Sequence, residues 1–230
     1  MATATSHRPR QLALALDHAE SYAREDFLSG SCNVAALQLV DLWPDWPANA
    51  LVIAGPEGSG KTHLAMTWAA ASGARVIPAR RLREPELPST LATGALLVED
   101  APDGAEDRTL FHLINLAREE KASLLFTARS APVVWPVALP DLTSRLRAIP
   151  VVTMHAPDAA MLRAVIVKLA ADRQLLLDES VVGYLAARIE RSFAAARAAV
   201  IALDREALRQ RRPPTRTLAA ELFRDETVLP

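Results

Sequence analysis

The residues best suited to chemistry in this 230-residue sequence form a glycine-rich stretch, GPEGSGKT, at positions 55–62. It matches G-x-x-x-x-G-K-[ST], a pattern whose glycines let backbone N–H groups turn inward around phosphates. Lys61 would reach the terminal phosphates, and the Thr62 hydroxyl would help to hold Mg²⁺. The stretch follows an apolar run and precedes a helical pattern, so a strand, a loop and a helix come in the order that a phosphate site needs. The structural alternative is a glycine-rich turn without a ligand.

A pair of acids ends another apolar run, LLVED, at positions 96–100. Phosphate-loop proteins use a carboxylate at the end of a neighbouring strand to orient Mg²⁺, and hydrolases use a second one to activate water. We assign Glu99 to the metal beside Thr62, and Asp100 to a catalytic role as base or water-orienting group. An aspartate would usually stand first, so Glu99 is a departure, and the short reach of Asp100 predicts slow intrinsic hydrolysis. Two acids that merely begin a loop are the alternative.

Thr127 and Arg145 are further candidates for contact with a terminal phosphate. Thr127 ends the apolar run 123–127, and in an adjacent strand it would lie between the glycine loop and the acids. Arg145 lies in the helical stretch 139–147, on the far side of the sheet from the glycine loop of its own chain, so it would reach a neighbour's nucleotide. A plain strand-end threonine and a solvated arginine remain open as alternatives.

Short apolar runs alternate with helical patterns through the first two thirds of the chain. The strand candidates are 50–54, 75–78, 95–98, 123–127 and 151–154, and the helical stretches between them are 63–71, 108–121 and 139–147. An earlier helical stretch, 33–42, ends at prolines. This alternation predicts an α/β fold with a five-stranded parallel sheet covered by helices on both faces.

The pattern changes after residue 157, where a proline and a capping aspartate precede three helical stretches, 159–173, 178–189 and 193–210. We therefore predict an α/β nucleotide-binding subdomain over 21–156 and a small all-helical lid over 157–230, after a flexible tail over 1–20. The basic cluster at 209–212 is typical of solvated positive charges at a helix end.

Composition narrows the classes of function. Half of the residues are apolar and the net charge is −1, so nothing in the overall balance demands a nucleic acid or a membrane surface as partner. The single cysteine, Cys32, excludes an internal disulfide. No apolar run approaches the roughly 18 residues of a membrane helix, and no signal peptide is recognisable. We expect a cytoplasmic protein.

These motifs together resemble the AAA+ module of the DnaA replication initiator across roughly residues 20–210. The sequence DFLSGSCN at 26–33 is similar to the segment that caps the adenine, 55–62 to Walker A and 96–100 to Walker B, while Thr127 falls at sensor 1. LPDLTSRL at 139–146 is similar to the box with the arginine finger, here Arg145. The resemblance implies ADP or ATP with Mg²⁺, bound by Phe27, Leu28, Glu57, Gly58, Ser59, Gly60, Lys61, Thr62, His63, Thr127 and Arg191.

The lid departs from that family at one position. The sensor 2 arginine aligns best with Ala194, which leaves Arg191 or Arg197 as imperfect substitutes, and we assign Arg191. With Glu99 at the metal position, this predicts a module that binds nucleotide, ADP above all, to set its shape and turns it over slowly.

No helix-turn-helix segment follows the lid, so we expect no sequence-specific DNA binding. The chain thus resembles the Hda type of shortened DnaA homologue, which stimulates hydrolysis of initiator-bound ATP while tethered to the sliding clamp. The N-terminal QLALAL stretch resembles its clamp-binding peptide, with partner-binding residues Gln11, Leu12, Leu14 and Leu16. The implied partners are the initiator and the polymerase clamp, and a homodimer remains open.

The sequence therefore predicts a negative regulator of replication initiation. Two alternatives from other classes stay open: an autonomous P-loop ATPase or nucleoside kinase, and a helicase-loader AAA+ protein. A further hypothesis is an adaptor that binds nucleotide but neither partner.

Overall fold

Five parallel strands form one sheet at the centre of an α/β subdomain, which we call the core. The computed structural model describes residues 23–224, and the strands run in the order β2-β3-β4-β1-β5. They are β1 (Ala50–Ala54), β2 (Arg75–Pro78), β3 (Ala95–Glu99), β4 (Ser123–Ala128) and β5 (Val151–Thr153). The predicted five-stranded parallel sheet is confirmed. Because β4 lies between β1 and β3, the carboxyl ends of these three strands meet at one edge.

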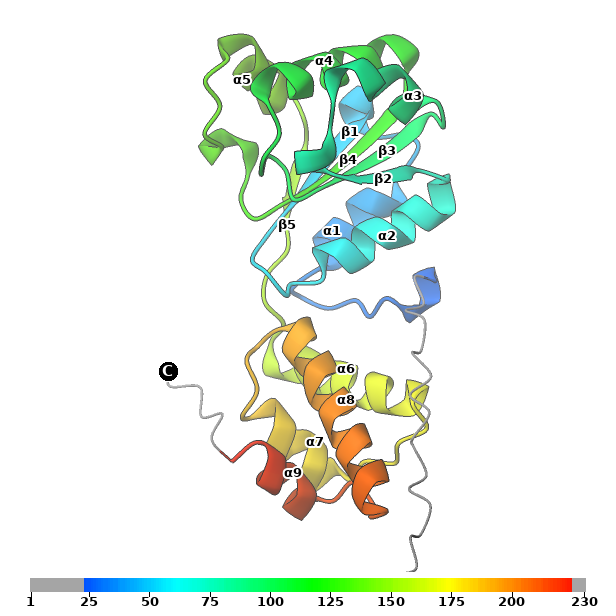
Figure 1. Cartoon of the computed structure of the whole chain (residues 1–230), viewed down its shortest axis with the longest axis vertical. Coiled ribbons are helices and arrows are strands. Elements are labelled where there is room, and N and C mark those ends of the chain that lie inside the picture. Colours follow the sequence, from blue (N-terminus) through cyan, green and yellow to red (C-terminus); the bar gives the residue numbers. More distant parts are fainter. Residues whose placement is uncertain (1–22, 225–230) are drawn as a thin grey trace, which may run out of the picture.

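Each face of the sheet has its own hydrophobic core. Along β1, Val52 packs into one core, whereas Leu51 and Ile53 pack into the other, because successive strand side chains point to opposite faces. Two helices cover the face of Leu51, and three cover the face of Val52 (Figure 1). The first set is α1 (Val34–Asp41) and α2 (Lys61–Ser72); the second is α3 (Leu87–Leu91), α4 (Asp107–Glu120) and α5 (Pro140–Arg147).

Short 3₁₀ helices connect these elements. They are η1 (Arg24–Asp26), η2 (Pro47–Asn49), η3 (Ala79–Arg81), η4 (Glu84–Glu86) and η5 (Pro132–Val134).

The remaining helices form a separate lid with its own core. They are α6 (Ala159–Asp172), α7 (Glu179–Ala186), α8 (Phe193–Gln210) and α9 (Arg216–Leu222). Side chains cap α6 and α8 at their N-termini. Asp158 accepts from the Met161 N–H at 2.7 Å, and Ser192 accepts from the Ala195 N–H at 3.0 Å. The short α9 was not predicted from the sequence.

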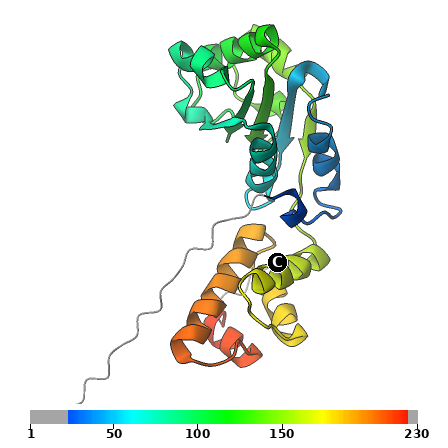
Figure 2. The same ribbon diagram turned by 90° about the vertical axis from the view of Figure 1, so that its right-hand side faces the viewer.

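Core and lid are two bodies stacked along the long axis of the molecule. The N-terminal segment, residues 23–33, runs between them in both views (Figures 1 and 2). Two polar contacts join it to α6: the Ser31 hydroxyl donates to Asp158 at 3.0 Å, and Lys168 pairs with Asp26 at 3.0 Å. Within residues 23–224, no helix has the length and apolar character needed to span a bilayer.

Candidate functional site

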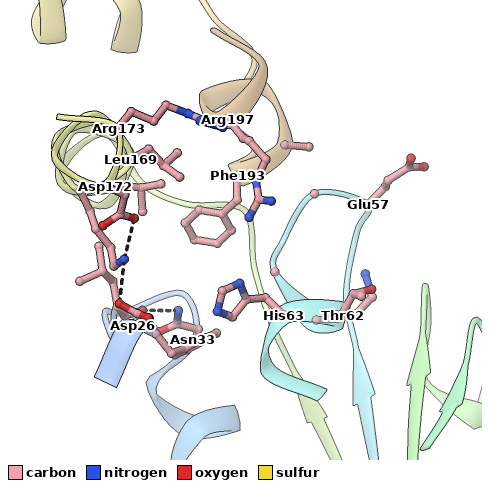
Figure 3. Close-up of a pocket in the computed structure, with 18 of the residues that line it drawn as sticks. Asp26, Asn33, Glu57, Thr62, His63, Leu169, Asp172, Arg173, Phe193 and Arg197 are labelled. Carbon is pink, nitrogen blue, oxygen red and sulfur yellow. Dashed lines mark hydrogen bonds and ion pairs between the residues drawn. The ribbon is translucent and has the colours of Figure 1, made fainter. Parts of the chain in front are cut away.

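A cavity of about 760 Å³ opens between the core and the lid (Figure 3). Its lining comes from the N-terminal segment, the glycine loop with the start of α2, the residues that follow β3 and β4, and the lid helices α6 and α8. Small-molecule sites commonly have volumes of roughly 300–1,000 Å³. The glycine loop forms the end of this cavity nearest the sheet, which we call the phosphate end. The opposite end, between residues 26–28 and α6, we call the base end.

The glycine loop contacts the lid directly. Gly58 has φ 73°, and a Cβ added there would lie 2.5 Å from Cβ of Ser192. The N–H of Phe193, the first residue of α8, donates to the carbonyl oxygen of Gly58 at 2.9 Å. Only a glycine allows both this backbone conformation and this close approach. The loop therefore lies against the start of α8.

Lys61 is held within the loop. Its side chain is buried, and its Nζ donates to the carbonyl oxygen of Pro56 at 2.7 Å. The Ser59 hydroxyl donates to the same oxygen at 2.8 Å. Burial lowers the pKa of Lys61, and the nearby charge of Asp100 opposes that shift. An anionic ligand would act in the same direction as Asp100 and favour the ammonium form.

The two acids lie beside Thr62 and Thr127. Glu99 is half-buried; burial raises its pKa, a hydrogen bond from the Thr62 side chain opposes the rise, and the charge of Asp100 adds to it. The N–H of Asp100 donates to Oγ1 of Thr127 at 3.1 Å, and Asp100 lines the cavity. The contact between Glu99 and Thr62 brings together a carboxylate and a hydroxyl, the oxygen ligands that Mg²⁺ accepts.

Residues 23–224 contain no cluster of three or more His, Cys, Asp or Glu side chains suited to a metal. A cation held by one carboxylate and one hydroxyl would need its other ligands from phosphate oxygens and water, as is usual for Mg²⁺ in nucleotide sites. The residues present therefore fit Mg²⁺ that arrives with a phosphate ligand.

The base end is assembled from three separate segments. The rings of Phe27 and His63 lie 5.6 Å apart, centroid to centroid. Lys168 on α6 pairs with Asp26 at 3.0 Å and with Asp172 at 2.8 Å. In Figure 3, His63 lies beside this ion-pair cluster and below Phe193. Burial and the Lys168 charge lower the pKa of His63, and Asp26 opposes them.

An asparagine fixes the turn beneath the base end. Nδ2 of Asn33 donates to the Leu28 carbonyl at 3.0 Å, and its Oδ1 accepts from the Gly30 N–H at 2.8 Å. Asn33 is buried, so both contacts are shielded from water.

Most of the predicted ligand-binding residues line the cavity. They are Phe27, Leu28, Glu57, Gly58, Gly60, Lys61, Thr62, His63 and Asp100. Ser59, Glu99 and Thr127 lie just behind this lining, in contact with Pro56, Thr62 and Asp100.

Arg191 is exposed and does not line the cavity, whereas Arg197 does. Helix α8 begins at Phe193, and Phe193 and Arg197 are four residues apart on the same helix face. Figure 3 shows both side chains extending from the lid into the cavity. Arg191 precedes this helix and does not share that face. Of the two arginines weighed for the lid, Arg197 is the one at the cavity.

Arg145 lies elsewhere, on α5, and does not line the cavity of its own chain. It is partly exposed, and its side chain makes no hydrogen bond or ion pair with another described residue. The predicted partner-binding residues Gln11, Leu12, Leu14 and Leu16 lie outside the described residues.

Several cavity residues were not predicted from the sequence. They are Arg129, Val165, Lys168, Leu169, Asp172, Arg173 and Phe193. Arg129 follows Thr127 by two residues, so its position at the end of a strand was a usable signal. The lid residues had no such signal, because only the tertiary fold brings α6 to residues 26–28.

No protein-family profile and no curated protein matches this chain. Solved structures do. Domain III of the Thermotoga maritima replication initiation protein DnaA has a TM-score of 0.74 and 21% identity, and the match covers 90% of this chain and 98% of that one. The replication initiator DnaA bound to AMPPCP and single-stranded DNA has a TM-score of 0.66 and 20% identity, over 83% of this chain and 68% of that one.

The match extends to a motor protein. The Thermotoga maritima RuvB Holliday junction branch migration motor has a TM-score of 0.68 and 14% identity, over 87% of this chain and 70% of that one. At these identities the likeness concerns the fold. The chain therefore has a DnaA-like fold, in which a five-stranded parallel sheet carries a glycine loop and a helical lid.

Proposed function

We propose that this protein is an adenine-nucleotide-dependent regulator of replication initiation that acts on a DnaA-type initiator. The observation that carries the nucleotide part is the cavity between core and lid, with the glycine loop at one end and aromatic and apolar side chains at the other. Phosphates need the inward N–H groups and Lys61, and a base needs a flat apolar enclosure such as that between His63 and Leu169. A similar structure binds AMPPCP, an adenine nucleotide.

Thr62 and Glu99 are the residues that would hold Mg²⁺. Bound there with the nucleotide, the ion would neutralise charge on the phosphates. Glu99 is half-buried and burial raises its pKa, and a bound cation would act in the opposite direction by favouring the charged form. Asp100 would orient water, and its backbone is fixed by the bond to Thr127.

The partner role rests on Arg145. This side chain is remote from the cavity of its own chain and pairs with no described carboxylate. An arginine so placed can enter the nucleotide site of a neighbouring molecule and stabilise charge on the transferred phosphoryl group, an effect of about 10³ to 10⁵ in rate. The close fit to domain III of an initiator, with coverage of 98% of that domain, supports a neighbour of the same fold.

The tether to the sliding clamp is the part of this proposal carried by sequence alone. The residues are Gln11, Leu12, Leu14 and Leu16. An extended peptide with alternating leucines can fill an apolar groove on a partner.

The test measures ATP hydrolysis by the DnaA initiator in the presence of this protein, ADP and DNA-loaded clamp. Arg145→Ala should abolish the stimulation, while Arg147→Ala, an exposed arginine on the same helix, should retain it. Clamp binding should survive Arg145→Ala and be lost in the Gln11→Ala, Leu14→Ala double variant. Stimulation that persists in Arg145→Ala would rule out the finger assignment.

The similarity to a RuvB motor favours one rival, an autonomous ATPase. That hypothesis requires substantial ATP hydrolysis by the isolated chain. Slow turnover that does not rise with protein concentration would argue for the regulator.

A further inference from the structure

Arg129 is a cationic side chain at the phosphate end, and the proposed function assigns it no role. It follows Ala128, the last residue of β4, and it lines the cavity. The N–H of Gly55, the first residue of the glycine loop, donates to the carbonyl oxygen of Ala128 at 3.1 Å. The backbone next to Arg129 is therefore tied to the loop.

The sheet order determines which part of the ligand Arg129 faces. The glycine loop follows β1, the acids follow β3, and β4 lies between these two strands. In a P-loop site the last phosphate lies between the loop and the acid that orients the metal. The residues that follow β4 therefore flank that phosphate.

Arg129 has one partner, and that pair is weak. Its Nη2 lies 3.4 Å from Oε2 of Glu57, and the two side chains are 70% and 83% exposed. Solvent-exposed ion pairs of this kind contribute little net free energy, so a stronger anion can replace the carboxylate. Glu57 belongs to the glycine loop, so the pair spans the mouth of the phosphate end.

Lys61 and Arg129 are both cations at the phosphate end of the cavity. The like charge of Arg129 is one of the causes that lower the pKa of Lys61, after burial. Lys61 is buried and bonded to the loop, whereas Arg129 is exposed and free to reorient. The phosphate end thus combines one fixed cation with one movable cation.

We propose that Arg129 is a specificity-determining residue that leaves Glu57 to bind the terminal phosphate of a nucleoside triphosphate in its own chain. The inference rests on the proposed nucleotide binding at this site. A guanidinium matches phosphate oxygens in a bidentate fashion. Since a diphosphate lacks the outermost phosphate, Arg129 distinguishes the triphosphate from the diphosphate, and Glu57 competes with the nucleotide for it.

The experiment measures the affinities of the full-length protein for AMPPCP and for ADP, each with Mg²⁺, by calorimetry. Arg129→Ala should weaken AMPPCP about tenfold, the loss of a charge-assisted contact, and change ADP by less than about twofold. The matched control is Arg108→Ala, which breaks an exposed arginine–glutamate pair of similar geometry, 3.2 Å to Glu84, outside the cavity. It should change neither affinity.

Equal losses for AMPPCP and ADP, or no loss for either, would overturn the assignment. If the wild type binds neither nucleotide, the proposed function fails instead, so the two failures are distinguishable. ADP binding by Arg129→Ala also shows that the variant is folded.

Glu57→Gln tests the exchange. It should strengthen AMPPCP binding about twofold to threefold when Arg129 is present, because the arginine no longer has to leave the Glu57 carboxylate. In the Arg129→Ala background the increase in affinity should be smaller, since there is no arginine to release. The same gain in both backgrounds would exclude competition between Glu57 and the phosphate for Arg129.

Discussion

The two ends of the cavity are built in different ways. The phosphate end takes its polar groups from the core and meets the lid at the start of α8: the loop follows β1, Lys61 is buried, and Ser59 and Lys61 both bond the Pro56 carbonyl. The base end joins the N-terminal segment, α2 and α6, and a partly exposed ion pair between Lys168 and Asp26 links them.

This contrast indicates how a ligand would order the molecule. A preformed phosphate end needs little rearrangement to accept an anion, whereas a base bound at the other end would contact core and lid at once. Binding energy from the base is then available to fix the lid against the core, while the phosphates supply most of the affinity.

The largest effect should come from Lys61→Ala. The loss of a buried cation aimed at phosphate should weaken ADP and AMPPCP by about 100-fold. Adenosine, which has no phosphate, should bind with unchanged affinity if the two ends are built independently. Calorimetry with the three ligands measures this, and Lys121→Ala, at the exposed end of α4, is the control. A parallel loss of adenosine binding would show that the two ends do not bind independently.

Gly58→Ala should have the next largest effect, through the contact between loop and lid. The new Cβ would lie 2.5 Å from Cβ of Ser192, so α8 must move away from the loop. The expected result is roughly tenfold weaker nucleotide binding, as the loss of about one good contact, and faster hydrogen exchange at the Phe193 amide.

Gly94→Ala is the matched control for backbone strain. Gly94 has φ 74°, close to the 73° of Gly58, but no atom lies within 4 Å of its added Cβ. Both variants pay the left-handed penalty of about 1 kcal/mol for an alanine. Only Gly58→Ala should alter exchange in the lid, and identical behaviour of the two would mean that the lid is not held by this contact.

A smaller effect is expected at the base end. Lys168→Met keeps the apolar stem but removes the pair that joins α6 to Asp26. Nucleotide affinity should fall about twofold to threefold at low salt, and the difference from wild type should disappear near 1 M salt, because partly exposed pairs are weak and screened. Titrations at two salt concentrations measure this.

The control for Lys168→Met is Asp41→Asn, which breaks the pair between Arg24 of the N-terminal segment and α1 and does not involve the lid. It should leave affinity unchanged at both salt concentrations. A difference between Lys168→Met and wild type that persists at high salt would point to a contact of the lysine with the ligand beyond the ion pair.

The sequence predicted the phosphate end far better than the base end, and the reason is local. Residues 55–62 are contiguous in the sequence. They directly follow β1, a buried strand whose side chains alternate between the two faces of the sheet, and this strand determines where they lie. The strand boundaries were predicted to within one residue, since every strand of this sheet is a short apolar run.

Lys168 and Phe193 were missed because their place at the site depends on how the lid docks. Nothing in the local pattern of α6 marks position 168 as a neighbour of Asp26, 142 positions earlier in the chain. The lid arginine illustrates the same limit. A one-turn uncertainty in where α8 begins decides whether Arg191 or Arg197 faces the cavity, and the Ser192 cap determines that start.

The smallest expected effect is a pH dependence of stability from His63. Burial first, and then the Lys168 charge on α6, lower the pKa of this imidazole, while Asp26 on η1 opposes them. The folded-state pKa is below the ordinary value of 6.5, so the unfolded chain takes up the proton first as pH falls. The stability contributed by neutral His63 is complete above pH 6.5 and is lost as pH falls through the folded-state pKa.

Thermal unfolding of the nucleotide-free protein between pH 7.5 and pH 5, two values that bracket about 6.5, measures this contribution. The melting temperature of the wild type should fall more steeply with acid than that of His63→Gln. Lys168→Met should give an intermediate slope, because it removes one of the causes that lower the pKa and leaves burial in place. If Lys168→Met has the wild-type slope, then the lid charge does not act on His63 in solution, and the base end is more open than the contact between α6 and residue 26 implies.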